Sequence, residues 1–243
     1  SCFSSSVSGF IISQNSLKEI FPEFEKDAPL ERKNIEHKFA ILGEDDSTII
    51  SYRKNPETPI SYSVMRGKFD RWMAEEAIKE GVILVEETVV RKLLVDGKKV
   101  VGVKTELEDY YADIVILADG VNSLLAKQIG LRNRFKDENV TLNVKEVFRL
   151  PKQRLEDRFN LNENEGIAAK ILGGPLKDMF AMGFMYTNED TISLGYGISL
   201  DVLKTNKIKP YELMDKLKEH PSIAPLIKDG ELIEYSAHLI PEG

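Results

Sequence analysis

The chain has 243 residues, a single cysteine and a formal net charge of −7. One cysteine excludes an internal disulfide framework, and the few scattered cysteine and histidine residues argue against a Cys/His zinc site. The acidic balance argues against a nucleic-acid-binding surface, and no apolar run approaches the roughly twenty residues of a membrane-spanning helix.

The first eighty residues predict helices and strands in alternation. Residues 16–24 are typical of a short helix, and residues 35–53 carry two strand-like runs around a turn. A second helix is expected from Gly67 to Glu80, because the apolar residues on one of its faces follow helical spacing. They are Phe69, Trp72, Met73 and Ala77.

Residues 82–118 predict a run of strands. Asp96-Gly97 is a hairpin turn signal between two of them. The run Ile114–Ala118 is apolar on both faces, which is typical of a buried, parallel strand. A glycine turn and a short helix that ends at Gly130 are expected to follow it.

The second half of the chain predicts a sheet with helices, and we expect a domain boundary near residue 140. Strands are expected at residues 141–149, 167–172, 179–186, 191–200 and 231–240. Helices are expected at residues 151–159 and 210–220, each with a proline in its first turn.

Arg66 is a candidate anion-binding residue. It precedes the helix that begins at Gly67, where the helix dipole is positive and a bare helix start already attracts anions. An arginine at that end is explained if a phosphate or carboxylate lies between its guanidinium and the helix start. The alternative is an arginine that is solvated or paired with a nearby acid.

Asp119 is the second candidate, because it lies where the buried strand runs into a turn and a helix. Ligands of open α/β sheets bind outside the carboxyl ends of the strands. The alternative is that Asp119 or Asn122 simply caps the following helix.

Lys145 and Glu146 are adjacent on a predicted strand, so one of them faces inward. A surface pair is the alternative. The histidines His220 and His238 have no partners at catalytic spacing, and we interpret both as structural. Several glycines in the second half indicate either bulges or the close approach of a ligand. They are Gly173, Gly174, Gly183, Gly195 and Gly197.

Five segments in register are more specific than any single residue. They read SYSVMRGKFDRWMAEEA, ADIVILADGVNSLLAKQIGL, VKEVFRLPKQRLEDRFNL, GFMYTNEDTISLGYGISL and HPSIAPLIKDGELIEYSAHLIPEG. From about Val7 to Gly243 the chain resembles the FixC family of FAD-dependent electron-transfer flavoprotein–quinone oxidoreductases. That family is part of the wider flavoprotein superfamily of p-hydroxybenzoate hydroxylase and geranylgeranyl reductase.

The resemblance implies how FAD is held. Arg66 matches the arginine of an R-x-x-F-D motif beside FAD, and Asp119 with Gly120 matches the second FAD fingerprint, A-D-G-x-N-S. Ser8 and Gly9 match a V-S-G-G loop near the flavin ring.

The resemblance also implies an α/β (α+β) fold. Residues 1–140 would form part of an FAD-binding Rossmann-like domain with a β-meander. Residues 141–235 would form a mixed or antiparallel sheet covered by helices, and residues 236–243 would return toward the first domain. The second domain would cover the flavin ring and form the quinone or lipid site. Substrate contacts would come from Gly183 and Phe184, and Lys145 and Glu146 are the candidates for residues near the ring.

Several departures from the family matter. The chain has no G-x-G-x-x-G motif for the FAD pyrophosphate, and it stops before the family's G-D segment. We therefore expect a central fragment of a longer protein that binds FAD only weakly by itself. Ala181 and Met182 replace part of a glycine run, and Phe10 replaces the second glycine of V-S-G-G.

Three functions follow as alternatives. The first is an FAD enzyme that passes electrons from an electron-transfer flavoprotein to quinone, with a ferredoxin-like protein as a further partner. The second is a geranylgeranyl or lipid reductase, and the third is a non-catalytic fragment without cofactor. The first function implies a cytoplasmic protein. A peripheral place at the inner face of the membrane is the alternative.

Overall fold

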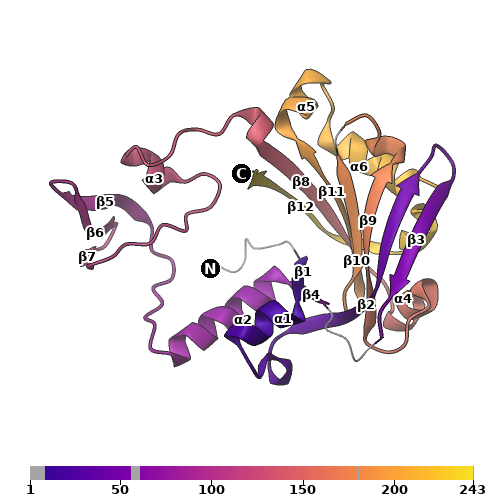
Figure 1. Cartoon of the computed structure of the whole chain (residues 1–243), viewed down its shortest axis with the longest axis horizontal. Coiled ribbons are helices and arrows are strands. Elements are labelled where there is room, and N and C mark those ends of the chain that lie inside the picture. The colour runs from indigo at the N-terminus through magenta and orange to yellow at the C-terminus, as the bar shows by residue number, and fades with distance from the viewer. Residues whose placement is uncertain (1–8, 56–60, 180, 243) are drawn as a thin grey trace.

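The computed structural model describes residues 9–55, 61–179 and 181–242, and these form two β-sheets with helices around the larger one (Figure 1). The larger sheet has nine strands within this part of the chain. Eight follow the order β1-β4-β2-β9-β10-β11-β8-β12, and β3 pairs with β2. The smaller sheet is the antiparallel meander β5-β6-β7. The mixed α/β class predicted from the sequence is therefore confirmed.

The elements have the following bounds. The strands are β1 (Gly9–Ser13), β2 (Leu30–Leu42), β3 (Ser47–Arg53), β4 (Ser61–Met65), β5 (Val90–Asp96), β6 (Lys99–Thr105), β7 (Asp109–Tyr111), β8 (Val140–Arg149), β9 (Glu165–Gly173), β10 (Met182–Thr187), β11 (Thr191–Ser199) and β12 (Glu231–Pro241). The helices are α1 (Gln14–Ile20), α2 (Arg66–Lys79), α3 (Leu124–Gln128), α4 (Lys152–Phe159), α5 (Leu200–Thr205), α6 (Pro210–Glu219) and α7 (Ala224–Ile227).

The predicted helices lie close to their expected positions. The helix expected at Gly67 begins at Arg66, and the two proline-initiated helices match α4 and α6. Pro210 occupies the first turn of α6, where its missing N–H costs nothing. None of the helices in the described ranges is long and apolar enough to cross a membrane.

One parallel pairing joins the two halves of the larger sheet. β2 runs parallel to β9, from Lys33 beside Glu165 to Leu42 beside Gly173, whereas the neighbouring pairs are antiparallel. Strands from both sides of residue 140 therefore share one sheet, although β8 begins at that residue. Residues 236–241 continue β12 along β8, and their expected return toward the first domain stays a prediction.

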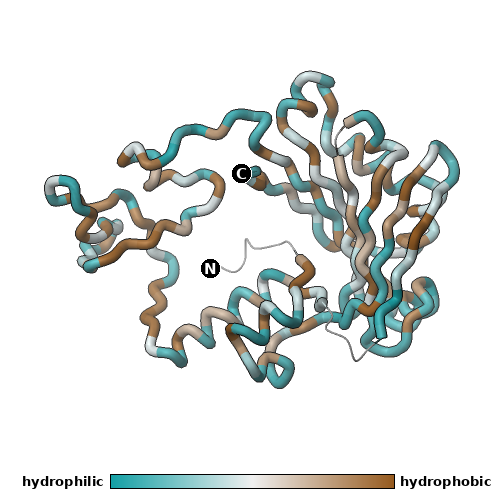
Figure 2. Tube along the Cα trace, in the orientation of Figure 1, coloured by the Kyte–Doolittle hydropathy of each residue, from teal (hydrophilic) through white to brown (hydrophobic). Residues whose placement is uncertain are grey.

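The expected buried strand at Ile114–Ala118 is not formed, and this prediction is wrong. These residues lie in no sheet, and Ile114 and Ile116 are 78% and 85% exposed. The apolar residues 82–85 likewise form an extended segment between α2 and β5 (Figure 2). A strand needs a neighbour for its N–H and C=O groups, and no strand of the described chain lies beside either run.

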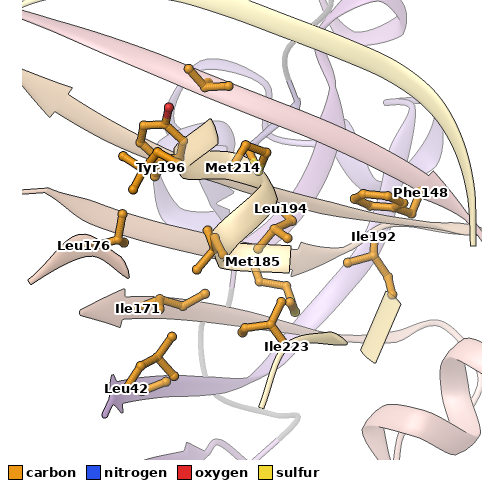
Figure 3. Close-up of a cluster of buried hydrophobic side chains, with 14 of the residues drawn as sticks. Leu42, Phe148, Ile171, Leu176, Met185, Ile192, Leu194, Tyr196, Met214 and Ile223 are labelled. Atoms are coloured by element: carbon orange, nitrogen blue, oxygen red, sulfur yellow. The ribbon is translucent and has the colours of Figure 1, made fainter. Parts of the chain in front are cut away.

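The main core lies between the larger sheet and the helices of the second half (Figure 3). Alternate residues of β8 to β11 point into it, among them Val144, Leu194 and Met185. Met214 of α6 packs on them, as the helical spacing of its sequence predicts. A second cluster buries Phe69 and Trp72 of α2 with residues of α1 and β4.

Arg32 of β2 ties this strand to the second half of the chain. Its side chain is fully buried and donates to the backbone oxygens of Asn188 (2.6 Å), Glu165 (2.8 Å) and Glu189 (2.7 Å). It also forms an ion pair of 3.0 Å with Glu156 of α4. The planar guanidinium suits this set because it presents several donors in a fixed geometry.

Candidate functional site

The face of the larger sheet that points away from the main core carries two rows of side chains across six strands, and we call it the open face. Strand register fixes both rows. The first row consists of His37, Ala168, Tyr186, Ser193, Val147 and Glu234. The second row consists of Phe39, Lys170, Phe184, Gly195, Lys145 and Ser236.

A cavity of about 660 Å³ lies over the β2–β9–β10 part of the open face. Its walls are largely apolar, which is typical of small-molecule sites of this size. The residues that line it and that matter below are Ile11, His37, Phe39, Ile50, Tyr52, Ala168, Lys170, Phe184 and Tyr186. The small side chain of Ala168 lies between His37 and Tyr186 in the first row.

Phe184 owes its position in the cavity wall to a glycine on the next strand. Gly195 lies opposite Phe184, and a Cβ there would approach the Phe184 ring to 2.3 Å. The missing side chain lets the ring lie across β11, with the Tyr186 ring 6.0 Å away and nearly parallel. Gly183 points the other way, toward Ile171 in the main core. Of the two predicted substrate residues, only Phe184 therefore lines the cavity.

Two polar groups beside the cavity are buried. They are Nε2 of His37 and the hydroxyl of Tyr186, which lies beside the Ser193 side chain of the next strand. Burial lowers the pKa of His37, and the charges of Lys54 and Lys170 lower it further, which favours the neutral imidazole. Burial raises the pKa of Tyr186, so its phenol stays protonated and able to donate. Sequence reasoning identified neither residue as part of a site.

Lys145 and Glu146 are both buried, but on opposite faces of β8. Lys145 lies on the open face and forms an ion pair of 3.0 Å with Glu234 of β12. Burial lowers the pKa of Lys145, and the Glu234 carboxylate opposes that shift. Glu146 forms an ion pair of 3.1 Å with Lys218 of α6 on the helix-covered face. The structure therefore separates the two candidates, and only Lys145 belongs to the open face.

Arg66 binds a carboxylate of its own helix. Its guanidinium contacts both oxygens of Asp70, one turn later, at 2.8–2.9 Å, and lies 5.5 Å from the centre of the Phe10 ring. This is the paired alternative stated from the sequence. An anionic ligand at this place would have to share the guanidinium with Asp70.

Asp119 and Gly120 shape the turn before α3. The carboxylate of Asp119 accepts a hydrogen bond from the backbone N–H of Leu125 at 3.0 Å, which is the capping alternative. Gly120 has a positive φ of 70°, which suits a residue without Cβ. Both residues are exposed.

Gly9 lies close to the cavity, whereas Ser8 lies outside the described residues. A Cβ on Gly9 would come within 2.9 Å of the Val64 carbonyl oxygen and 3.0 Å of the Tyr186 hydroxyl. The backbone at Gly9 therefore runs directly beside Tyr186. His220, interpreted as structural, is buried with its Nε2 3.3 Å from the backbone oxygen of Gly43.

Comparison with known families matches the second half of the chain. A family model described as ETF-QO, ubiquinone-binding, matches residues 140–240. This range contains β8 to β12 and therefore Ala168, Phe184 and Tyr186 of the cavity.

FixC proteins match nearly the whole chain. Protein FixC of Bradyrhizobium diazoefficiens is 41% identical over 246 residues, which cover 99% of this chain and 57% of that protein. Protein FixC of Azotobacter vinelandii is 44% identical over 248 residues, which cover 99% and 56%. The chain thus spans a little over half the length of these curated relatives. The resemblance stated from the sequence is confirmed.

Solved structures confirm the fold. A geranylgeranyl bacteriochlorophyll reductase-like protein from Thermoplasma acidophilum aligns with a TM-score of 0.75 at 19% identity, over 98% of this chain and 57% of that one. The flavin-dependent brominase Bmp2 aligns with a TM-score of 0.68 at 14% identity, over 93% and 54%. CtdE, solved in complex with FAD, aligns with a TM-score of 0.58 at 11% identity, over 98% and 64%.

Proposed function

We propose that this chain, whose resemblance to the FixC family is confirmed, acts within an FAD-dependent oxidoreductase that passes electrons from an electron-transfer flavoprotein to quinone. The observation that carries the proposal is the apolar cavity on the open face. Five of its lining residues lie in the range matched by the ubiquinone-binding family model. A quinone head group is flat and largely apolar, and a cavity of this size and lining suits it.

FAD is the cofactor that the resemblance implies. In support, Gly9 has no side chain between its backbone and the Tyr186 hydroxyl beside the cavity. Arg66 and the Asp119-Gly120 turn remain proposed contacts, and in this structure Arg66 binds Asp70 and Asp119 accepts from the N–H of Leu125. The sequence contains no glycine-rich motif that would hold the pyrophosphate. FAD, when bound, would supply the electrons, while the open face would hold the quinone and exclude water from it. Quinone reduction also consumes two protons, and the phenol of Tyr186 is a protonated group in the cavity.

The test is made with excess FAD added to the purified chain, because the chain alone is expected to bind it weakly, and the same FAD without the chain gives the background. Anaerobic reduction should bleach the visible absorbance of the flavin. Addition of a water-soluble ubiquinone should then restore the oxidised flavin spectrum, faster than in the background, and form quinol in proportion. A chain that binds no flavin even from excess FAD would favour the non-catalytic alternative. A reduced flavin that quinone does not reoxidise would contradict the proposal.

A lipid reductase is the second candidate, favoured by the similarity in fold to the geranylgeranyl reductase-like protein. An apolar cavity would also accept an isoprenoid chain. The same reduced flavin distinguishes the two functions, because a lipid reductase would be reoxidised by an isoprenoid alkene. An electron-transfer flavoprotein, a ferredoxin-like partner and a peripheral place at the membrane remain predictions of the first proposal.

A further inference from the structure

The charged residues at the cavity on the open face are all of one sign. Among the described residues that line it, two are lysines, Lys38 and Lys170, and none carries a carboxylate. The chain as a whole is acidic, with a net charge of −7, so this lining departs from its average composition. Alternation along β2 directs the side chain of Lys38 to the other face of the sheet, where it forms an ion pair of 3.5 Å with Glu36. Lys170 therefore needs a separate explanation.

Lys170 lies between two aromatic residues of the cavity wall. Strand pairing places it opposite Phe39 of β2 on one side and opposite Phe184 of β10 on the other. Ala168 precedes it by two residues on the same face of β9. The Lys170 side chain is exposed and forms no ion pair or hydrogen bond with any other residue that the structure describes. Its ammonium, on a flexible four-carbon stem, can therefore reach a ligand that lies over Ala168.

The charge of Lys170 acts on the cavity. Together with Lys54 it lowers the pKa of His37 in the neighbouring row, and the neutral imidazole adds no charge. The carboxylate of Glu234 also belongs to the open face, but it lies on β12, three strands along from β10, and is paired with Lys145. An anion in the cavity would thus meet an attracting charge and no carboxylate among the described residues of the lining.

We infer that Lys170 holds a negatively charged oxygen of the ligand, so that the cavity prefers an anionic quinone ring to a neutral one. The inference deepens the proposed function and rests on it. Reduction of a quinone by two electrons from the flavin turns both carbonyls into C–O groups, and each oxygen takes one proton from water. Until its proton arrives, such an oxygen is negatively charged, and a cation beside it stabilises the charge where it develops.

The experiment measures binding to this chain, by calorimetry, of the hydroxynaphthoquinone lawsone and of its methyl ether. Lawsone is an anion at neutral pH and the ether is neutral, while the two rings have nearly the same shape. The quantity compared is the ratio of the two affinities. Lys170→Met keeps the apolar stem and removes the charge, so it should lower this ratio about 3- to 10-fold through weaker binding of lawsone. Lys170→Arg keeps the charge and should keep most of the ratio.

Lys177→Met is the matched control. It changes the net charge by the same amount, but its side chain is 62% exposed and lies outside this cavity. The ratio of the two affinities should therefore stay as in the original chain.

The salt dependence of binding gives a second readout, which the original chain supplies without any substitution. Added sodium chloride screens exposed charges, so it should weaken the binding of lawsone and leave that of the methyl ether nearly unchanged. In Lys170→Met this difference between the two compounds should disappear.

The outcomes separate the inference from the proposed function. If both compounds bind with a ratio that Lys170→Met does not change, the role of Lys170 is refuted and the quinone cavity stands. An equal fall of the ratio in Lys177→Met would also refute it, because the net charge of the chain would then be the cause. Ala168→Leu should fill the cavity floor and abolish binding of both compounds, and unchanged binding there would place them elsewhere and overturn the inference. If neither compound binds the original chain, both proposals fail.

Discussion

Replacement of Arg32 by methionine should destabilise the chain severely. The substitution keeps an apolar stem of similar length but removes three hydrogen bonds to backbone carbonyl oxygens and the ion pair with Glu156. Removing one partner of a buried pair typically costs about 3–5 kcal/mol, because the remaining charge is left uncompensated. The orphaned carbonyl oxygens add to this. We therefore expect a loss of at least about 4 kcal/mol, a large share of the roughly 5–15 kcal/mol that holds most domains together.

Urea unfolding followed by circular dichroism measures this loss. Arg32→Lys should lose about half as much, since it keeps the charge but not the fork of donors. The double variant Arg32→Met with Glu156→Leu should recover part of the loss, because no buried carboxylate is left unpaired. Arg149→Met is the matched control. Its side chain is about half exposed, with ion pairs of 3.6–3.7 Å, and it should cost less than about 1 kcal/mol. A loss below about 1 kcal/mol in Arg32→Met would show that these buried contacts of Arg32 do not stabilise the fold.

The remaining predictions concern a histidine, a glycine and the cofactor. Because the folded chain lowers the pKa of His37 from 6.5, the unfolded chain binds its proton more readily. The stability linked to this group is present above about pH 6.5 and is lost as the pH falls. In His37→Phe the urea midpoint should therefore decrease less between about pH 7 and 5 than in the original chain. Gly195→Ala would place a Cβ 2.3 Å from the Phe184 ring and should cost about 1–3 kcal/mol, whereas Gly197→Ala, with its nearest contact at 3.1 Å, should cost less in the same unfolding assay. The chain alone should bind FAD several decades more weakly than a flavoprotein with a complete phosphate cradle, because several charge-assisted hydrogen bonds are missing. Flavin fluorescence titration checks this, and a chain that purifies with stoichiometric FAD would contradict it.

Local signals predicted the helices and the meander well. Pro210 in a first turn, helical spacing in α2 and the Asp96-Gly97 hairpin each act over a few residues, and the structure has the expected element at each place. Gly97 has a positive φ of 59°, as such a turn requires.

The prediction of a strand or of its pairing was wrong or missing where the strand depends on a partner far away in the sequence. The run Ile114–Ala118 has the composition of a buried strand, but composition does not supply the neighbouring strand that would complete it. The parallel pairing of β2 with β9 could not be predicted from local sequence either, because it joins segments about 130 residues apart, such as Lys33 and Glu165.

The candidate site was predictable only in part. Phe184 came from the resemblance and lines the cavity, and alternation along β8 correctly placed Lys145 and Glu146 on opposite faces. His37 and Tyr186 come together only through the register of three strands, which no local pattern reveals.

Photoaffinity labelling shows directly whether the open face of the sheet binds quinone. A ubiquinone analogue that carries an azide is illuminated with the chain, and labelled peptides are mapped by mass spectrometry, with excess unlabelled ubiquinone as the control. We expect protectable labelling in β2, β9 and β10, at peptides that contain His37, Ala168 and Phe184. Protectable labelling confined to α6, on the other face of the sheet, or to the exposed apolar residues 114–118 would contradict it.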